Sequence, residues 1–308
     1  MNYVSVVVTF NRKELLIEAV QSLLNQTESP QRVIVIDNCS TDGTPELFKQ
    51  TFDQESKVDG RLKYVRLPEN VGGSAGFYRG LEEAKKEQAE WISLSDDDAI
   101  FAKDYFALLN RAAMDHPDQR VLTGTVRLAS GPIDSPHRER LTSTATLSVK
   151  PVADAEYTHD FNCDIFSFCG VVLKRSLIDQ IGMPEKDYFI RFDDFEYAVR
   201  ARKYGTFLNV SKALITHKTT DEGHTISPWK EYYVTRNRVA MLRKHSTNHV
   251  VAHLYLYYVM ARKLLAMVMV SDRRKVAKYL RRAYFAGYHD GYHNRLGRND
   301  AFLPGNKY

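Results

Sequence analysis

The feature that most constrains the fold is a repeated alternation of two patterns over the first 100 residues. Short runs rich in Val and Ile predict buried β-strands at 3–10, 32–37, 62–68 and 90–95. Apolar residues at helical spacing fill the segments between them, at 13–26, 42–52 and 73–87. Strands that alternate with helices favour a parallel sheet with helices on both faces, so we predict an α/β fold.

Polar or glycine-rich segments follow these four strands, at 9–12, 37–42, 70–76 and 96–98. Because ligands of such sheets bind beyond the carboxyl ends of the strands, we expect the four segments to meet in one crevice. The chain is irregular over 121–165 and turns helical from about 229. We therefore divide it into an α/β domain, residues 1–225, and a helical extension, residues 226–308.

Three adjacent aspartates, Asp96, Asp97 and Asp98, follow the fourth strand. In an extended segment alternate side chains share a side, so we expect Asp96 and Asp98 to converge while Asp97 points elsewhere. Two carboxylates suit a hard cation such as Mg²⁺ or Mn²⁺, which can bridge a diphosphate. The alternative is a solvated turn or a helix cap. The position at a strand end favours the cation site.

The segment "ENVGGSAGFYRG", residues 69–80, is rich in glycine. Glycines allow positive φ and a close approach of the backbone to a ligand. Ser74 and the N-terminus of the following helix offer hydrogen-bond donors to an anion or to sugar hydroxyls. The segment matches neither the dinucleotide fingerprint nor a Walker loop. A simple tight turn is the alternative.

A second acidic cluster, Asp193, Asp194 and Glu196, lies in the first turn of a predicted helix. Carboxylates there complement the helix dipole, which is the structural explanation. The functional one is a general base that faces the same crevice. His217 lies at a later strand end, and an imidazole would complete an Asp/Asp/His set for a transition ion. A single histidine is more often an ordinary surface or core residue.

Charge is unevenly distributed along the chain. Residues 221–308 contain 16 Lys and Arg against 6 Asp and Glu, within a net charge of +5. Such a basic tail indicates an anionic partner, for example a membrane surface or a polyanionic substrate. A helix packed on the α/β domain or on another subunit explains the tail equally well. Arg262 and Lys263 interrupt the longest apolar run, so we expect no membrane-spanning helix.

The three cysteines have no zinc spacing, and they indicate a reducing cytoplasm. The N-terminus, "MNYVSVVVTFNR", is typical of a first β-strand rather than of a signal peptide.

Together, these segments resemble a known family. "VSVVVTFNRKELLIEAVQSLLNQT" and "VIVIDNCSTDGT" are similar to the start of inverting family 2 glycosyltransferases with the GT-A fold. The acidic triplet resembles that family's DxD motif, and "RFDDFEYAVRARKYG" resembles its base-bearing motif. More narrowly, "NVGGSAGFYRG", "DDDA", "FDDFE", "THK" and "WKEYYVTRN" resemble bacterial galactofuranosyltransferases and their rhamnosyltransferase-like relatives. The resemblance covers residues 3 to 240, and Ala75 stands where we expect Gly.

The resemblance implies a GT-A fold, a Rossmann-like and mostly parallel sheet with flanking helices, over residues 1–225. It also implies site residues. Nucleotide and donor-sugar contacts would come from Thr9, Arg12, Asp37, Asn38, Asn70, Gly72, Gly73, Ser74 and Asp97. Mn²⁺ or Mg²⁺ would be held by Asp96, Asp98 and His217. Asp194 would be the base, and the acceptor side would include Asp193, Glu196, Trp229 and Arg236, with Tyr232 and Asn237 beside them.

The implied reaction transfers galactofuranose from UDP-galactofuranose to a hydroxyl of a growing surface polysaccharide, of the O-antigen, capsule or galactan type. A dTDP-rhamnose or UDP-hexopyranose donor stays open, as does a catalytically silent sugar-binding subunit. We expect a cytoplasmic protein that contacts the inner face of the membrane, with a lipid-linked or polymeric glycan acceptor and no nucleic-acid partner. The sequence leaves open the acceptor, the linkage, and whether the chain forms a homo-oligomer.

Overall fold

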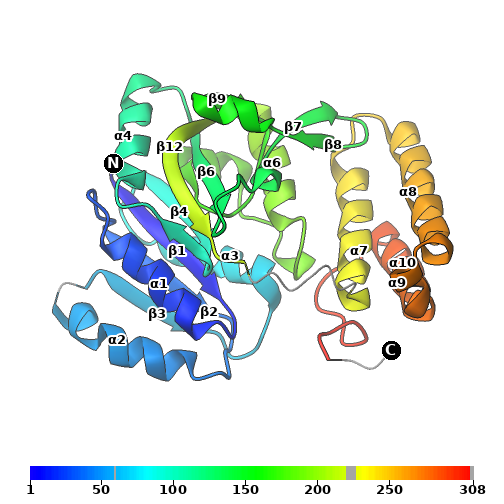
Figure 1. Cartoon of the computed structure of the whole chain (residues 1–308), viewed down its shortest axis with the longest axis horizontal. Helices are drawn as coiled ribbons and strands as arrows, with labels where there is room; N and C mark the ends of the chain where they lie inside the picture. Colours follow the sequence, from blue (N-terminus) through cyan, green and yellow to red (C-terminus); the bar gives the residue numbers. More distant parts are fainter. Residues whose placement is uncertain (59, 220–226, 306–308) are drawn as a thin grey trace.

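The computed structural model describes residues 1–58, 60–219 and 227–305 of the 308-residue chain. Figure 1 shows an α/β body and, beside it, a group of helices from the C-terminal part of the chain. The boundary that we predicted between residues 225 and 226 lies outside the described residues. The helical group begins with α7 (Pro228–His245).

The body is built on one mixed sheet with the strand order β3-β2-β1-β4-β11-β6-β12-β5, and β9 pairs with β12. The four strands predicted from the sequence are β1 (Tyr3–Thr9), β2 (Arg32–Asp37), β3 (Leu62–Arg66) and β4 (Trp91–Asp96). They pair in parallel, as predicted. The later strands are β5 (Ala99–Phe101), β6 (Val121–Leu128), β9 (Phe161–Cys163), β11 (Val171–Lys174) and β12 (Phe207–His217).

The mostly parallel sheet that we expected is confirmed for β1 to β4, and β6 also pairs in parallel with β12, but the other pairs of this sheet are antiparallel. β11 runs antiparallel to both β4 and β6, and β5 and β9 run antiparallel to β12. Parallel neighbours need a long crossover, which the helices of the first 100 residues provide. Between β6 and β11 the chain instead forms part of a small second sheet, from β7 (Arg138–Ser143), β8 (Ser148–Pro151) and β10 (Ile165–Phe166), and returns in the opposite direction.

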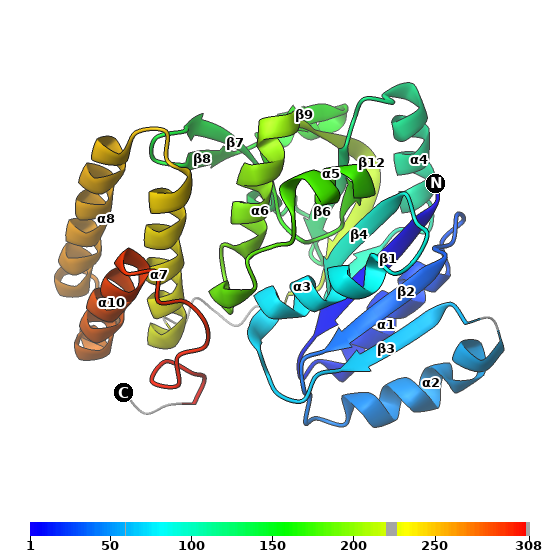
Figure 2. The same cartoon turned by 180° about the vertical axis from the view of Figure 1, so that it is seen from behind.

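Helices cover both faces of the sheet, because alternate side chains of its buried strands point to opposite sides. From β1, Val6 packs with α3, whereas Val7 packs with α1. One face carries α1 (Lys13–Leu24), α2 (Thr44–Val58) and α4 (Tyr105–Asp115). The other carries α3 (Gly72–Ala84), α5 (Arg175–Ile181) and α6 (Asp193–Ala201), as Figure 2 shows.

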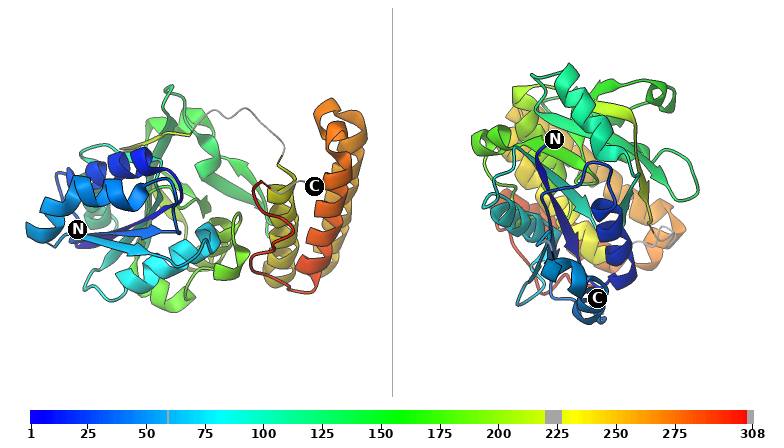
Figure 3. Two further views of the ribbon diagram at one scale, coloured as in Figure 1. Left: turned by 90° about the horizontal axis from the view of Figure 1, so that it is seen from below. Right: turned by 90° about the vertical axis from the view of Figure 1, so that its left-hand side faces the viewer.

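The C-terminal helices pack on one another and on the body. They are α7, α8 (His249–Met269), α9 (Ser271–Lys275) and α10 (Ala277–Tyr292). At Gly287 a side chain would collide with the α7 backbone at Tyr232, so α10 lies directly against α7. Figure 3 shows these helices side by side at one end of the molecule. No described helix combines the length and the apolar character needed to cross a bilayer.

Candidate active site

Two cavities meet where the strands of the first half end. The β1 cavity, of about 630 Å³, is lined by the end of β1 and by Asn38, Asn70 and Asp97. The α6 cavity, of about 730 Å³, is lined by the start of α6, including Asp193 and Asp194. Gly73, Asp96 and Ile190 line both. The single crevice predicted from the strand ends is thus a pair of cavities with a shared wall.

At the floor of the β1 cavity, the exposed Arg12 pairs with the buried carboxylates of Asp97 and Asp98. Asp97 accepts hydrogen bonds from the Thr9 hydroxyl (2.7 Å) and from Arg12 Nη1 (3.2 Å). The same Arg12 nitrogen lies 2.7 Å from Asp98 Oδ2. Burial raises the pKa of Asp97 to about 6, although Arg12 and Thr9 oppose the shift. The network joins the end of β1 to the acidic triplet.

Asn38 and Asn70 shape the opposite wall of the β1 cavity. Asn38 Nδ2 donates to Asn70 Oδ1 (3.0 Å), and the Val71 amide donates to Asn38 Oδ1 (3.0 Å). Asn70 Oδ1 also accepts from the Gly72 amide (2.9 Å). Gly72 has φ +85°, and a side chain there would collide with the Phe189 carbonyl, so this position requires glycine. The segment is therefore the start of α3 rather than a free loop.

Asp37 is fully buried and lines neither cavity. Its carboxylate accepts hydrogen bonds from the Ser40 amide (2.8 Å) and the Tyr64 hydroxyl (2.5 Å), and Arg66 Nε lies 3.6 Å away. In this arrangement Asp37 stabilises the turn after β2, and its side chain does not reach the cavity in which we expected it to contact the nucleotide.

The alternation of side chains along a strand does not determine which of the three aspartates lie on the same side. β4 ends at Asp96, residues 97 and 98 form a turn, and β5 begins at Ala99. A turn breaks the period of two on which our argument rested, so Asp97 and Asp98 are buried together on Arg12 while Asp96 is exposed on the shared wall. The surrounding protein and the negative charges of Asp98, Asp97, Asp193 and Asp194 raise the pKa of Asp96 well above its ordinary value.

Asp98 and His217 lie beside each other behind this wall. Asp98 Oδ1 is buried without a hydrogen-bond partner among the described residues, 3.4 Å from His217 Nε2. Burial would raise the pKa of Asp98, but His217 and Arg12 outweigh it and hold this pKa below its usual range. An orphaned buried carboxylate oxygen facing an imidazole nitrogen fits a divalent cation. Among the described residues, however, the predicted set of Asp96, Asp98 and His217 does not come together as three ligand atoms within reach of one ion.

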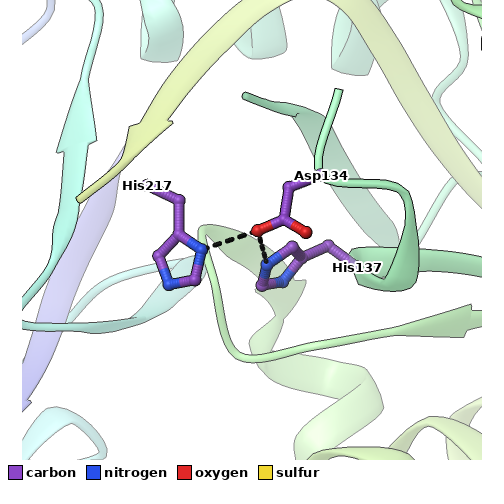
Figure 4. A group of neighbouring side chains, drawn as sticks. All are labelled: Asp134, His137 and His217. Carbon is purple, nitrogen blue, oxygen red and sulfur yellow. Dashed lines mark hydrogen bonds and ion pairs between the residues drawn. The ribbon is translucent and has the colours of Figure 1, made fainter. Parts of the chain in front are cut away.

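The other nitrogen of His217 is held by a residue that the sequence did not single out. His217 Nδ1 lies 2.7 Å from Asp134 Oδ2, and His137 Nε2 lies 3.0 Å from the same oxygen, as Figure 4 shows. The ligand atoms of these three residues are close enough together to hold a metal ion themselves. Burial lowers the pKa of His217, but Asp134 and Asp98 prevail and raise it to about 10. A bound cation would have to displace this proton.

In the α6 cavity, Asp193 and Asp194 lie at the start of α6, and no described Lys, Arg or His forms an ion pair with either carboxylate. Burial and the charge of Asp194 raise the pKa of Asp193 to about 7. Burial also raises the pKa of Asp194, although the Phe195 amide (2.7 Å) and Arg191 oppose the shift. A carboxylate with a raised pKa is a better proton acceptor near pH 7 than an ordinary aspartate.

Two residues predicted to contact an acceptor are buried away from both cavities. Glu196 is fully buried and binds Arg200 (2.9 Å) and His245 (2.8 Å). Arg236 is fully buried and donates to backbone carbonyls, among them Tyr188 O (2.8 Å). These positions correct our expectation, since neither side chain can reach a ligand in this arrangement. Trp229 does line a cavity, but it is the β1 cavity.

Several cavity residues escaped the sequence reasoning. Arg298, Leu303 and Pro304 close the β1 cavity from the C-terminal end of the chain, and Arg298 donates to the Asn70 carbonyl (3.2 Å). Lys230 and Arg273 line the α6 cavity. No local pattern marks these residues, because their proximity depends on how the helical extension docks. One sequence pattern could have identified Asp134 and His137 as candidate metal ligands, namely a carboxylate and an imidazole three residues apart.

Comparison with known proteins is consistent with this geometry. The Glycosyl transferase family 2 model matches residues 5–182. Galactofuranosyltransferase GlfT1 of Mycolicibacterium smegmatis is 28% identical over 219 residues, which are 67% of this chain and 68% of that protein. The dTDP-rhamnosyl transferase RfbF of Shigella flexneri is 20% identical over 301 residues, which are 92% of this chain and 94% of that protein.

Among solved structures, GalNAc-T7 with UDP, GalNAc and Mn²⁺ superimposes with a TM-score of 0.65 at 15% identity. The match covers 95% of this chain and 56% of that one, and it supports the GT-A fold. Since the family model spans more than half of the chain, the protein belongs to glycosyl transferase family 2 and is a glycosyltransferase.

Proposed function

We propose that the protein is an inverting, metal-dependent transferase that moves galactofuranose from UDP-galactofuranose to a hydroxyl of a growing surface polysaccharide. The observation that carries the proposal is the position of Asp96 on the wall between the two cavities. A cation-compatible pair, Asp98 and His217, lies near it, and Asp194 lies in the α6 cavity. A leaving group and a base on separate sides of a sugar are what one inverting displacement requires.

In this proposal the β1 cavity holds the nucleotide. Thr9, Arg12, Asn38 and Asn70 are at its walls, and Gly73 leaves the shared wall open, since a side chain there would meet nothing within 4 Å. The donor sugar would pass from the nucleotide across Gly73 and Ser74 into the α6 cavity. Both residues line that cavity.

Asp96, Asp98 and His217 are the residues that would hold a divalent cation. When bound, Mn²⁺ or Mg²⁺ supplies positive charge that neutralises the departing diphosphate. The chain's own contribution is to keep Asp98 ionised through Arg12 and His217 and to orient His217 through Asp134.

Asp194 would take the proton of the acceptor hydroxyl as that oxygen attacks the anomeric carbon. The C–O bond to the nucleotide diphosphate breaks as the new glycosidic bond forms, and one displacement inverts the centre. Asp193, also on this cavity, would contact the acceptor, and its raised pKa keeps one proton close to the pair. Lys230 offers a positive charge at the rim.

Similarity to the galactofuranosyltransferase GlfT1 and the glycines at 72 and 73 support galactofuranose as the donor sugar. Similarity to the dTDP-rhamnosyl transferase RfbF makes dTDP-rhamnose the second candidate. We expect transfer or donor hydrolysis with UDP-galactofuranose in a panel that also contains dTDP-rhamnose and UDP-hexopyranoses. Turnover with dTDP-rhamnose alone would exclude our assignment of the donor.

We also propose that the helical extension contacts an anionic membrane surface beside a lipid-linked or polymeric acceptor. The side chains exposed on its helices support this proposal. Large apolar side chains are exposed along α8, at Val250, Val251, Leu254, Tyr257, Tyr258, Leu265, Val268 and Met269. Exposed basic residues lie on the following helices at Arg274, Lys275, Lys278, Arg281 and Arg282. Apolar burial and attraction to anionic lipids act together in such peripheral binding.

Vesicle sedimentation tests this surface. We expect the protein to sediment with vesicles containing anionic lipid, and we expect weaker binding by Leu254→Ser/Leu265→Ser. A double variant on another exposed face, Met114→Ser/Tyr204→Ser, serves as the control. Equal binding of both double variants to the vesicles would refute the α8 surface, and a concentration-dependent dimer lost with the first one would assign it to a second copy of the chain.

A further inference from the structure

The turn that leads into α6 has an unfavourable backbone. Phe189, Arg191 and Phe192 all have positive φ, at 66°, 68° and 68°. Residues with a side chain rarely adopt this conformation, and three within four positions persist only where the surroundings hold them. Asp193 and Asp194 follow immediately, so the position of the proposed base depends on this turn.

Asn237 of α7 holds the turn through its side-chain amide. Its Nδ2 donates to the carbonyls of Tyr188 (3.0 Å), Ile190 (2.9 Å) and Arg191 (2.9 Å). The side chain is fully buried, so water cannot replace these bonds. The amide has two N–H hydrogens for three carbonyls, so at least one hydrogen is shared between two of the acceptors that the unusual φ angles bring to the same side.

Arg236 fixes the direction in which this amide points. Its Nε donates to Asn237 Oδ1 (2.9 Å), so the Nδ2 of Asn237 must face the turn. Arg236 Nη2 donates to the carbonyls of Tyr188 (2.8 Å) and Asp187 (3.2 Å), and Nη1 donates to that of Gly297. The two neighbouring residues of α7 act as one clamp.

The clamped turn connects both cavities. Ile190 lines both of them, Arg191 and Phe192 line the α6 cavity, and the Phe189 carbonyl accepts from the Ser74 amide of α3 (3.1 Å). At the other end of α7, His245 binds Glu196 of α6 (2.8 Å). The helical extension thus holds α6 at two points.

We propose that Asn237 is a positioning residue that places the base for catalysis, with Arg236 orienting its amide. The inference rests on the proposed role of Asp194. It makes α7 a part of the catalytic apparatus: without the three hydrogen bonds, the turn relaxes toward ordinary φ values and Asp194 leaves its place opposite the donor.

The test compares Asn237→Ala with Arg243→Ala, a control on the same helix whose guanidinium lies over the Tyr292 ring, away from the turn. We expect Asn237→Ala to lower kcat roughly 10- to 100-fold, as misplacement of a reacting group by about 1 Å does. The KM for the donor and the Kd for UDP should stay within about threefold, because Thr9, Arg12, Asn38 and Asn70, the proposed nucleotide contacts, lie outside the turn. Amide hydrogen exchange should accelerate over 188–195 and not over β1. Asn237→Gln, which retains an amide, is the second variant if Asn237→Ala does not fold.

Four outcomes are informative. Unchanged kcat, or unchanged exchange over 188–195, overturns the proposal. Parallel loss of UDP binding and kcat also overturns it, because it indicates a general structural role. A selective fall in kcat with faster exchange supports it. Asp194→Asn measured alongside separates the proposed function from this inference: if that variant keeps full turnover, the base assignment fails, while the exchange result in ligand-free protein still reports on the clamp.

Discussion

Asp98 of the first acidic group and the pair Asp193 and Asp194 of the second are the same residue type in opposite electrostatic settings, whereas the pKa values of Asp96 and Asp97 are raised like those of the second group. In the first, Arg12 contacts both Asp97 and Asp98, and His217 faces Asp98, so the pKa of Asp98 stays below its usual range. In the second, burial and mutual repulsion raise the pKa values of Asp193 and Asp194. Carboxylates that keep their charge attract a cation, whereas carboxylates that resist ionisation accept a proton. The neighbouring charges, and not the residue type, therefore determine whether an aspartate is suited to bind a cation or to accept a proton.

The largest effect should come from removing the proton acceptor of the second group. Asp194→Asn retains the shape of the side chain but not its basicity, and general-base catalysis contributes about 10²–10⁴-fold. We expect kcat to fall by that amount while UDP binding, measured by calorimetry, changes little. Transfer at a rate near that of the unaltered protein would show that Asp194 is not the base.

Removing a charge from the acidic triplet should lower the affinity of the protein for a divalent cation. Asp98→Asn removes the charge of the orphaned oxygen, and we expect Mn²⁺ affinity to drop by roughly 100-fold, because even outer-shell partners of metal ligands cost 10–100-fold. Electron paramagnetic resonance of free Mn²⁺ measures this directly. Asp194→Asn is the matched control and should bind Mn²⁺ normally. Equal affinity of the two variants would remove Asp98 from the cation site.

The pH dependence should follow the second group. A base acts when deprotonated, so a raised pKa delays activity to higher pH. Because burial raises the pKa of the proposed base Asp194, we expect kcat at saturating cation to keep rising with pH beyond the range in which an ordinary aspartate is already ionised, and to level off only at higher pH. An ordinary aspartate would level off above about pH 4–5. A kcat that is already constant from pH 5 upward would show that the pKa of the catalytic carboxylate is not raised.

The smallest effect should come from Asp134, which contacts His217 from behind. Asp134→Asn weakens the hydrogen bond to His217 Nδ1, and we expect a loss of about tenfold in Mn²⁺ affinity. The number of nitrogens bound to Mn²⁺, measured by pulsed resonance, should be one. Two bound nitrogens would mean that the ion is held by Asp134, His137 and His217 instead. Ser167→Ala, at the far side of His137, is the control.

The N-terminal half of the fold could be predicted because its signals are local. The strand and helix periods over the first 100 residues are set by side chains that are neighbours in sequence, and β1 to β4 pair in parallel as expected. The antiparallel return of β11 had no such signal, since strand pairing there depends on how a long irregular segment folds. For the same reason alternation failed at Asp97 and Asp98, where a turn replaces the strand.

The sequence by itself determined the family, the order of the first strands and helices, and the chemistry available at their ends: an acidic triplet, a glycine-rich helix start and a second acidic pair. Only the tertiary structure decided which carboxylate has a cation partner, that Asp134 stands behind His217, and that Arg236 and Asn237 face the turn before α6 and not a ligand. The physical reason is the separation in sequence between the groups that interact. Periodicity and composition reflect interactions along a few residues, whereas charge compensation joins groups that are far apart in the chain and meet only when the α/β body folds. The clamp likewise forms only when α7 packs beside the turn before α6.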